Sequence, residues 1–157
     1  MKFKRYLPLL VLFMVSALAA FALVFDRLDN LVNWIRFFMG SLFCQFSMLK
    51  LFNLTQFADG FQKYDWIARR SRGYAYTYPF IELGLGLAYL SGIELFGINI
   101  IAICLTAIGA FGVLQSMKAG LDVRCACMGT ILDVPLSTVT LTEDLGMGIM
   151  ALFMLIF

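Results

Sequence analysis

The chain alternates long apolar stretches with short polar ones. The apolar stretches cover Leu7–Phe25, Leu31–Leu54, Tyr74–Gly92, Leu95–Ser116 and Ser137–Phe157. Each approaches the length of about 20 residues that a helix needs to cross a bilayer. Because a membrane-spanning segment must satisfy its backbone hydrogen bonds internally, we expect all of these stretches to be helices. The pattern predicts an all-α, polytopic transmembrane helical bundle.

The first apolar stretch, Leu7–Phe25, follows a basic start that reads KFKR. Ala17 and Ala19 fit the small-residue pattern at which signal peptides are cleaved, but the apolar run continues past them, further than is usual in a signal peptide. We therefore expect a retained N-terminal helix or signal anchor, and cleavage within it would leave four spans. The predicted organisation is one membrane domain, 1–157, with this extra helix ahead of a four-helix core over 31–157.

The polar segment between the second and third stretches reads TQFADGFQKYDWIARRSRG. Phe57, Phe61, Tyr64 and Ile67 recur at the spacing of one helical face, and the charged residues lie mostly elsewhere around the helix. This pattern predicts an amphipathic interfacial helix, with its aromatic side chains in the headgroup layer and its basic end facing anionic lipid. We expect Gly73 to end this helix.

Composition supports a membrane location and excludes several kinds of chemistry. Hydrophobic residues make up 62% of the chain and charged residues 14%, whereas about a quarter of a soluble domain is charged. The chain has no histidine, which excludes His-based zinc sites, imidazole ligation of haem and Ser-His-Asp catalysis. A formal net charge of +2 is too small to indicate a nucleic-acid partner.

The lysines and arginines are distributed unequally between the two sides of the predicted bundle. One side has only Arg27, with Arg36 inside a helix, where it is expected to pair internally or to extend toward the surface. The positive-inside rule therefore predicts that the other side is cytoplasmic, together with the N-terminus and the loop before the last span. That side carries Lys2, Lys4, Arg5, Lys50, Lys63, Arg69, Arg70, Arg72, Lys118 and Arg124.

Two cysteines stand one residue apart in that loop, in the motif RCACMG. A reducing cytoplasm keeps such residues mostly as thiols unless a partner oxidises them. A Cys125–Cys127 disulfide would close a very tight ring, so it should be strained and easily reduced, which suits exchange. Arg124 and Lys118 would favour the nucleophilic thiolate. The motif predicts redox work by Cys125 and Cys127, assisted by Arg124.

Two other interpretations of the motif stay open. Thiolates and thioethers are the ligands that Cu(I) prefers, so Cys125, Cys127 and Met128 could bind or conduct a copper-type ion. Free cysteines are also common as inert apolar residues, and the chain would then be a non-catalytic assembly subunit. Only the copper interpretation involves a cofactor; the redox interpretation requires none.

Acidic residues within the apolar stretches are costly and therefore functional candidates. Glu82 falls near the bilayer centre, or near the cytoplasmic surface if Pro79 takes the first helical position. Thr140 and Glu143 also fit a capping box, so capping explains Glu143 and Asp144 as well as function does. Under the predicted topology all three acids lie toward the cysteine loop, where Glu82 or Asp144 would accept a proton during thiol chemistry.

The remaining cysteines and the small residues indicate packing. Cys44 and Cys104 lie within predicted helices at different depths, so we expect them to pack rather than to pair. Small residues at helical spacing allow close approach of helices. They are Gly84, Gly86 and Ala88 in one stretch and Ala102, Thr106 and Ala110 in the next.

From about Trp34 onward the order of features resembles the MauE branch of the DoxX-like membrane proteins. The resembling stretches are SMLKLFN, QFADGFQKYDWIARR, YPFIELGLGLAYLSG and the cysteine motif before the last helix. In that family the motif usually reads Cys-Gly-Cys-Phe-Gly, and here Ala126 and Met128 replace the Gly and the Phe. The resemblance covers roughly residues 34–157.

The resemblance implies a role in methylamine utilisation, in the bacterial-type inner membrane. Such a protein would help process, transport or oxidise the disulfide-rich small subunit of methylamine dehydrogenase. Its implied partners are a thioredoxin- or glutaredoxin-like protein or the disulfide-rich client, besides the lipid bilayer. It would be at most a thiol–disulfide oxidoreductase that acts through Cys125 and Cys127.

Overall fold

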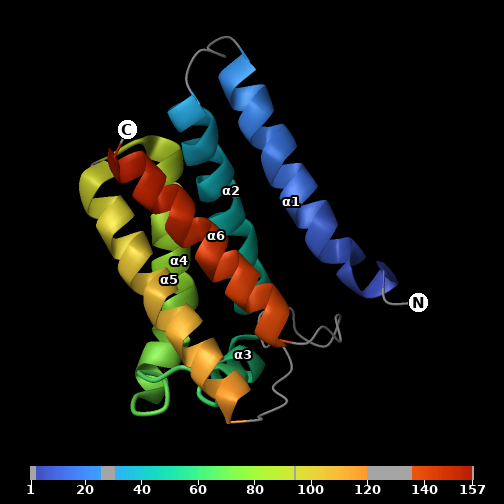
Figure 1. Ribbon diagram of the computed structural model, residues 1–157, viewed down its shortest axis with the longest axis vertical. Helices are drawn as coiled ribbons and strands as arrows, with labels where there is room; N and C mark the ends of the chain where they lie inside the picture. Colours follow the sequence, from blue (N-terminus) through green and yellow to red (C-terminus); the bar gives the residue numbers. More distant parts are fainter. Residues whose placement is uncertain (1–2, 26–30, 94, 120–135, 157) are drawn as a thin grey trace.

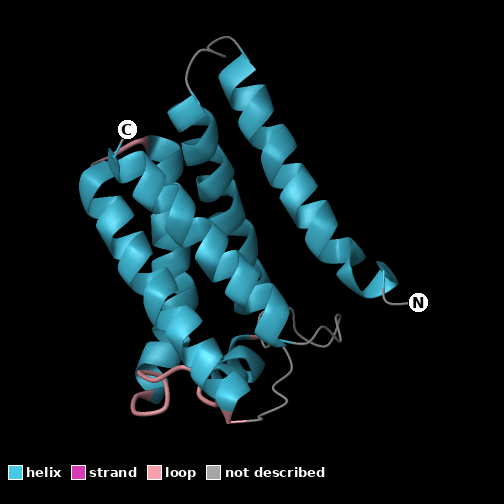
Figure 2. Cartoon of the chain, viewed as in Figure 1, coloured by secondary structure: helices cyan, strands magenta, loops and turns pink. Residues whose placement is uncertain are grey.

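The computed structural model describes residues 3–25, 31–93, 95–119 and 136–156. Within these residues every regular element is a helix, as predicted (Figures 1 and 2). The helix bounds lie within about one helical turn of the apolar stretches. In chain order the helices are α1 (Phe3–Val24), α2 (Leu31–Phe52), α3 (Leu54–Phe61), α4 (Arg72–Ser91), α5 (Leu95–Lys118) and α6 (Leu136–Ile156).

Two of these helices are long and apolar enough to cross a membrane. They are Leu31–Phe52, which is α2, and Phe96–Lys118 within α5. Leu9–Val24 of α1 is a shorter apolar helix. The lengths of the two longer helices fit the ~30 Å hydrocarbon core of a bilayer.

The long helices α2, α4, α5 and α6 lie side by side, and α1 lies at the edge of this group, against α2 (Figure 1). The short helix α3 lies at one end of the group, together with the last turn of α5 and the first turn of α6 (Figure 1). We call this the α3 end. The C-terminus lies at the opposite end, where α4 ends and α5 begins (Figure 1).

Helices α2 and α4 approach each other closely because both carry glycine at their contact. A Cβ atom added at Gly86 would lie 2.7 Å from Cys44 Sγ and 3.0 Å from the carbonyl oxygen of Gly40. One added at Gly40 would lie 2.9 Å from Leu90 Cγ. Gly86 therefore acts in packing, as predicted, and so does Cys44. Gly84 has open space at its Cβ position and takes no part in this contact.

The small residues of α5 face α6. Ala102, Thr106 and Ala110 are all buried, and a Cβ atom added at Gly148 of α6 would lie 3.1 Å from Thr106 Oγ1. The same seam holds Asp144, whose Oδ2 would lie 2.7 Å from a Cβ at Gly109. Small side chains allow this close helix pairing, as the sequence predicted.

The predicted amphipathic helix is shorter than expected, and its aromatic residues have a different role. It ends at Phe61, and the chain then forms turns up to Arg70. Phe57 and Phe61 are almost fully buried, and the Phe61 ring centroid lies 4.5 Å from that of Tyr78 in α4. The aromatic face therefore packs against protein, and its predicted place among lipid headgroups is wrong. Its apolar partner is α4, which the local sequence does not reveal.

The turns after α3 are organised by a buried carboxyl group. Asp65 Oδ1 accepts hydrogen bonds from the backbone N–H groups of Ile67, at 2.9 Å, and of Ala68, at 2.8 Å. Burial raises the pKa of Asp65, and these hydrogen bonds and the charge of Arg69 lower it in part. Ser71 then caps α4 by accepting from the backbone N–H of Tyr74, so Gly73 opens a helix rather than ending one.

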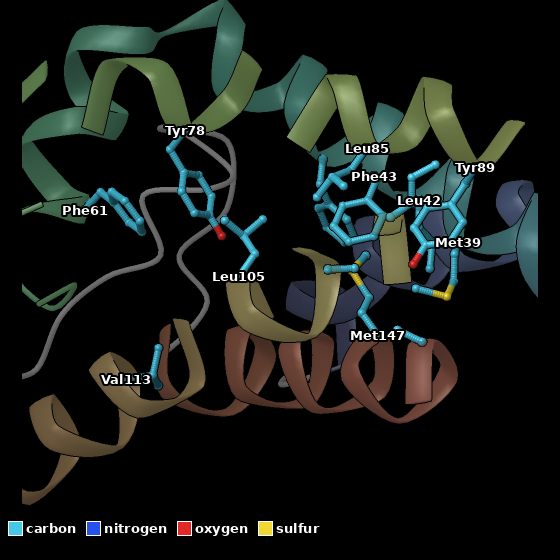
Figure 3. Packing of buried hydrophobic residues seen from close by; sticks show 14 of the residues in the cluster. Met39, Leu42, Phe43, Phe61, Tyr78, Leu85, Tyr89, Leu105, Val113 and Met147 are labelled. Atoms are coloured by element: carbon cyan, nitrogen blue, oxygen red, sulfur yellow. The ribbon is translucent and has the colours of Figure 1, made fainter. Parts of the chain in front are cut away.

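Buried side chains from every long helix of the core group meet between the helices (Figure 3). Phe43 of α2 stacks on Tyr89 of α4, with ring centroids 6.0 Å apart. Met147 of α6 extends toward Phe43 and Leu42, and Leu105 of α5 lies beside the hydroxyl end of Tyr78 (Figure 3). These contacts hold the helices around one apolar core.

The α2–α4 contact predicts opposite effects for two neighbouring glycines. Gly86→Ala should destabilise the protein by about 1–3 kcal/mol, because the added methyl overlaps Cys44 and the backbone of α2. Gly84→Ala should be neutral or slightly stabilising, because its Cβ meets nothing and alanine favours helix. Thermal unfolding of both variants in detergent checks the contrast. Equal effects at the two positions would contradict the close α2–α4 contact.

Candidate functional site

The centre of the candidate site is an ion pair inside the helix group. Lys50 Nζ of α2 donates to both carboxylate oxygens of Glu82 of α4, at 2.5 and 2.6 Å. The two side chains are only 3% and 5% exposed. A bidentate pair with this geometry is among the strong hydrogen-bonded contacts in proteins. The pair therefore links the last turns of α2 to the middle of α4.

Aromatic rings cover the ammonium group of Lys50. Its Nζ lies 5.1 Å from the ring centroid of Tyr78 and 5.6 Å from that of Phe57 in α3. Rings in such positions attract a cation through their quadrupoles. Lys50 was expected to be a cytoplasmic surface charge, and this expectation is wrong because its side chain turns inward to Glu82.

Glu82 lies in the middle of its helix. Helix α4 begins at Arg72, so Pro79 stands inside the helix and Glu82 beyond it, near the midpoint. The alternative in which Pro79 takes the first helical position, which would put Glu82 near the surface, is therefore wrong. The helix starts earlier because Ser71 supplies the cap.

Glu143 and Asp144 also face inward. Helix α6 begins at Leu136 and has no acidic residue in its first turn, so the two acids stand well inside the helix. Capping therefore does not explain them, since a capping residue precedes the helix or belongs to its first turn. Both residues are more than nine-tenths buried.

These residues meet around one small cavity near the α3 end. We call Lys50, Glu82, Glu143 and Asp144 the interior polar cluster. The cavity measures about 10 Å³, roughly the space that one water molecule requires. Its lining comes from five helices, α2 to α6, and from the turns after α3. The lining residues are Lys50, Phe57, Phe61, Tyr64, Tyr78, Gly109, Glu143 and Asp144.

The convergence of the acids was predicted from topology. Glu143 and Asp144 line the cavity, and Glu82 joins it through Lys50. A buried mixture of carboxylates, an ammonium group and a phenol can hold and exchange protons. Within the described part of the chain no group of three or more acids or cysteines is arranged to hold a metal ion.

The cysteine motif itself lies outside the described residues. Cys125, Cys127, Arg124 and Met128 belong to the stretch between α5 and α6. What the structure describes is the two anchors of that stretch, Lys118 and Leu136, both at the α3 end (Figure 1).

The other polar and sulfur-containing residues are not part of the cluster. Cys104 is exposed, so the expectation that it packs within the chain is wrong, and neither it nor Cys44 forms a disulfide. Arg36 lies over the ring of Phe37, with 4.5 Å from Cζ to the ring centroid. Its guanidinium group lies against Gly92, at the end of α4 remote from α3.

A comparison with known protein families identifies the family of this chain. The sequence model of the family described as "Methylamine utilisation protein MauE" matches residues 28–157. The chain belongs to the MauE family. MauE proteins are membrane proteins, which agrees with the two apolar helices of membrane-spanning length. The match includes α2 to α6 and leaves out α1. No curated protein and no solved structure matches the chain.

For this MauE-family chain, sequence reasoning missed Lys50 as the partner of Glu82. One signal was present: Lys50 follows a long apolar run, and Glu82 is the lone acid of another. Two such residues of opposite charge in different spans pair more readily than they face lipid. The position of Phe57 beside Lys50 depends on the path of α3, for which the sequence offers no comparable signal.

Because the ion pair is buried, each single substitution in it should reduce stability more than the double substitution does. Lys50→Met or Glu82→Gln alone should destabilise the protein by about 3–5 kcal/mol, because each leaves a buried charge without its partner. The double variant Lys50→Met/Glu82→Leu should recover most of this loss. Denaturant unfolding in detergent measures the coupling.

The exposed ion pair Arg72–Asp59 serves as the matched control. Its atoms approach to 2.8 Å, but both side chains are more than half exposed. Asp59→Asn should therefore cost less than about 1 kcal/mol. Additive effects of the two substitutions at Lys50 and Glu82 would show that the buried pair does not couple the helices.

Proposed function

We propose that this protein is a multi-pass inner-membrane protein that assists thiol–disulfide exchange in a partner protein. Helices α2, α4, α5 and α6 form its four-helix transmembrane core, and α1 is an added membrane helix. Cys125 and Cys127 are the redox-active residues. Membership of the MauE family and the two apolar helices of membrane-spanning length support this assignment.

The observation that carries the proposal is the position of the loop anchors relative to the interior polar cluster. Asp144 stands eight residues after Leu136, so about 12 Å of helical rise separates the cluster from the start of α6. Residues 119–135 join α5 to α6, and a chain of that length spans up to about 55 Å when extended. The motif is therefore tethered within reach of buried groups that can exchange protons.

The exchange has two steps, and its atoms and electrons balance. The thiolate of Cys125 or Cys127 attacks a disulfide of the partner, so a mixed disulfide forms and one partner thiolate leaves. The second loop cysteine then attacks the mixed disulfide and releases the other partner thiolate. The loop becomes the Cys125–Cys127 disulfide, and two electrons pass to the partner. In the reverse direction the loop disulfide oxidises a partner dithiol.

Proton transfer assigns roles to the charged residues. Each attacking thiol must lose a proton, and each departing thiolate gains one. Arg124, next to Cys125, stabilises the thiolate. Asp144 is the nearer proton acceptor along α6, and Glu82 acts through its ion pair with Lys50. This division supports Cys125, Cys127, Arg124, Glu82 and Asp144 as the functional residues.

Charge supports the orientation and the type of partner. Lys63, Arg69, Arg70 and Arg72 are exposed in the turns after α3 and at the start of α4. The positive-inside rule then assigns the α3 end to the cytoplasm. There the partner is a thioredoxin- or glutaredoxin-like protein, which would connect the motif to a disulfide-rich client such as the small subunit of methylamine dehydrogenase.

Trapping of the mixed disulfide tests this function. A Cys125→Ser or Cys127→Ser variant lacks the thiol that resolves the intermediate, so at least one of the two should accumulate a partner joined through a disulfide. The measurement is non-reducing electrophoresis of membranes after an oxidising challenge, with mass spectrometry of the adduct. Cys104→Ser is the matched control and should trap nothing.

The trapping experiment and two further measurements distinguish the alternative functions. Absence of any adduct in both variants would contradict the redox assignment. Purified protein that carries Cu(I), and loses it in the Cys125→Ala/Cys127→Ala variant, would support copper binding through these residues and Met128. Full cellular function of that double variant would support a non-catalytic assembly subunit.

A further inference from the structure

The turns after α3 and the first turn of α4 carry an excess of positive charge at the surface. Residues 54–76 are all described, and five charged side chains among them are exposed: Asp59, Lys63, Arg69, Arg70 and Arg72. Four cations and one acid give this segment a formal surface charge of +3. The other acid of the segment, Asp65, is fully buried. We call the four cations together with Trp66 the basic surface.

Aromatic rings lie beside two of the guanidinium groups. Arg70 Cζ lies 5.6 Å from the ring centroid of Trp66, and Arg72 Cζ lies 5.8 Å from that of Tyr76. A guanidinium group over a ring keeps N–H groups at its edge, which suits the binding of phosphate oxygens. Arg69 is held differently, because its Nη2 donates to the carbonyl oxygen of Lys63 at 2.8 Å. The basic surface therefore presents its guanidinium groups from defined positions.

The exposed face of α4 changes from charged to apolar along the helix. Arg72, Tyr76 and Phe80 stand four residues apart, so they follow one another on one face. Arg72 is exposed, Tyr76 is partly buried, and Phe80 is 55% exposed. About 12 Å of helical rise separates the first of these residues from the last. This order of side chains is typical of a helix that passes from water through the headgroup layer into hydrocarbon.

Trp66 has the properties of a side chain in the headgroup layer. It is 55% exposed, although Asp65 and Ala68 beside it are buried. Indole rings favour the membrane–water interface because they are largely apolar and carry one N–H donor. Phe57 and Phe61, for which the headgroup position was predicted, are buried, and Trp66 is the exposed ring of residues 54–76.

We propose that the basic surface binds the phosphate headgroups of anionic phospholipid, with Trp66 in the headgroup layer and with Lys63 and Arg70 donating to phosphate oxygens. Charge complementarity selects this occupant, because the cytoplasmic leaflet is anionic and attracts clustered lysines and arginines. The order of side chains along α4 favours lipid over an acidic protein, because the charged residues lead directly into exposed apolar ones. The inference rests on the membrane placement proposed above and does not involve the cysteines.

Quenching of Trp66 fluorescence in reconstituted vesicles tests the proposal. The chain has two tryptophans, so Trp34→Phe leaves Trp66 as the reporter. Trp34 stacks on Phe38, and phenylalanine retains an aromatic ring there. The vesicles contain equal amounts of phosphatidylglycerol and phosphatidylcholine, and one of the two lipids is brominated near the headgroup so that it quenches an indole in contact with it. Brominated phosphatidylglycerol should quench Trp66 more strongly, and the ratio of the two should give a several-fold preference for the anionic lipid.

Charge substitutions should change this preference in both directions. Lys63→Gln/Arg70→Gln should reduce it, by up to about fivefold for each charge removed. Asp59→Asn should increase it, because this variant removes the acid that pairs with Arg72. Arg36→Gln is the matched control: it removes a positive charge at the end of α4 remote from α3 and should leave the preference unchanged.

Equal quenching by the two brominated lipids in the Trp34→Phe protein would overturn the proposal and favour an acidic protein as the occupant. A preference that is unchanged in Lys63→Gln/Arg70→Gln would overturn it as well. Carbonate extraction of the same vesicles measures membrane insertion separately, so a failure of the membrane placement is distinguishable from a failure of lipid binding. If a variant does not fold, native mass spectrometry of the unaltered protein decides: retention of phosphatidylglycerol over phosphatidylcholine supports the proposal, and equal retention contradicts it.

Discussion

The buried ion pair between Lys50 and Glu82 joins two long helices in the interior of the protein. It fixes the end of α2 against the middle of α4, and the close glycine contact of Gly40 with Gly86 continues the same helix pair. A pair removed from water is stable only when its geometry is good and its surroundings complete. Aromatic residues of α3 and α4 complete them, because Phe57 and Tyr78 cover the ammonium group. The short helix α3 therefore packs over the interior polar cluster, with Phe57 and Phe61 lining the cavity.

Features of the fold that depend on residues close together in the sequence could be predicted, whereas contacts between distant segments could not. Apolar stretches of membrane-spanning length predict helices because backbone hydrogen bonds must close within each span, and the observed helices follow those stretches. Small residues such as Thr106 and Gly86 likewise predicted the close contacts in which they take part. Residues that often mark helix ends were less reliable guides. Gly73 lies in the first turn of α4 and Pro79 lies inside it, because Ser71 caps the helix two residues before the glycine. The packing partner of α3 could not be predicted from the sequence, because its aromatic face fits a headgroup layer and a protein partner equally well.

The candidate site also has features that the sequence predicts and features that it does not. The topology of alternating spans brings Glu82, Glu143 and Asp144 toward one end. In the structure Glu143 and Asp144 line one cavity, and Glu82 is paired with Lys50 of the same lining. Lys50 was counted with the surface charges because lysine at the end of a span usually extends to the interface. Its inward direction follows from the position of a carboxylate on another helix, which no single stretch of sequence contains. The roles of Cys125, Cys127 and Arg124 stay predictions, supported by the motif, by the MauE family and by the anchors of the loop.

The proposed function requires Cys125 and Cys127 to be a redox-active pair that is accessible from the cytoplasm. Thiol labelling tests it most directly, in sealed membrane vesicles of either orientation and in a Cys44→Ala/Cys104→Ala background that leaves only the loop thiols. We predict labelling with a membrane-impermeant reagent from the cytoplasmic face, and a marked increase after addition of reductant or after challenge of the oxidised protein with a thioredoxin-like dithiol. Labelling only from the opposite face, or labelling that neither oxidant nor reductant changes, would contradict the account.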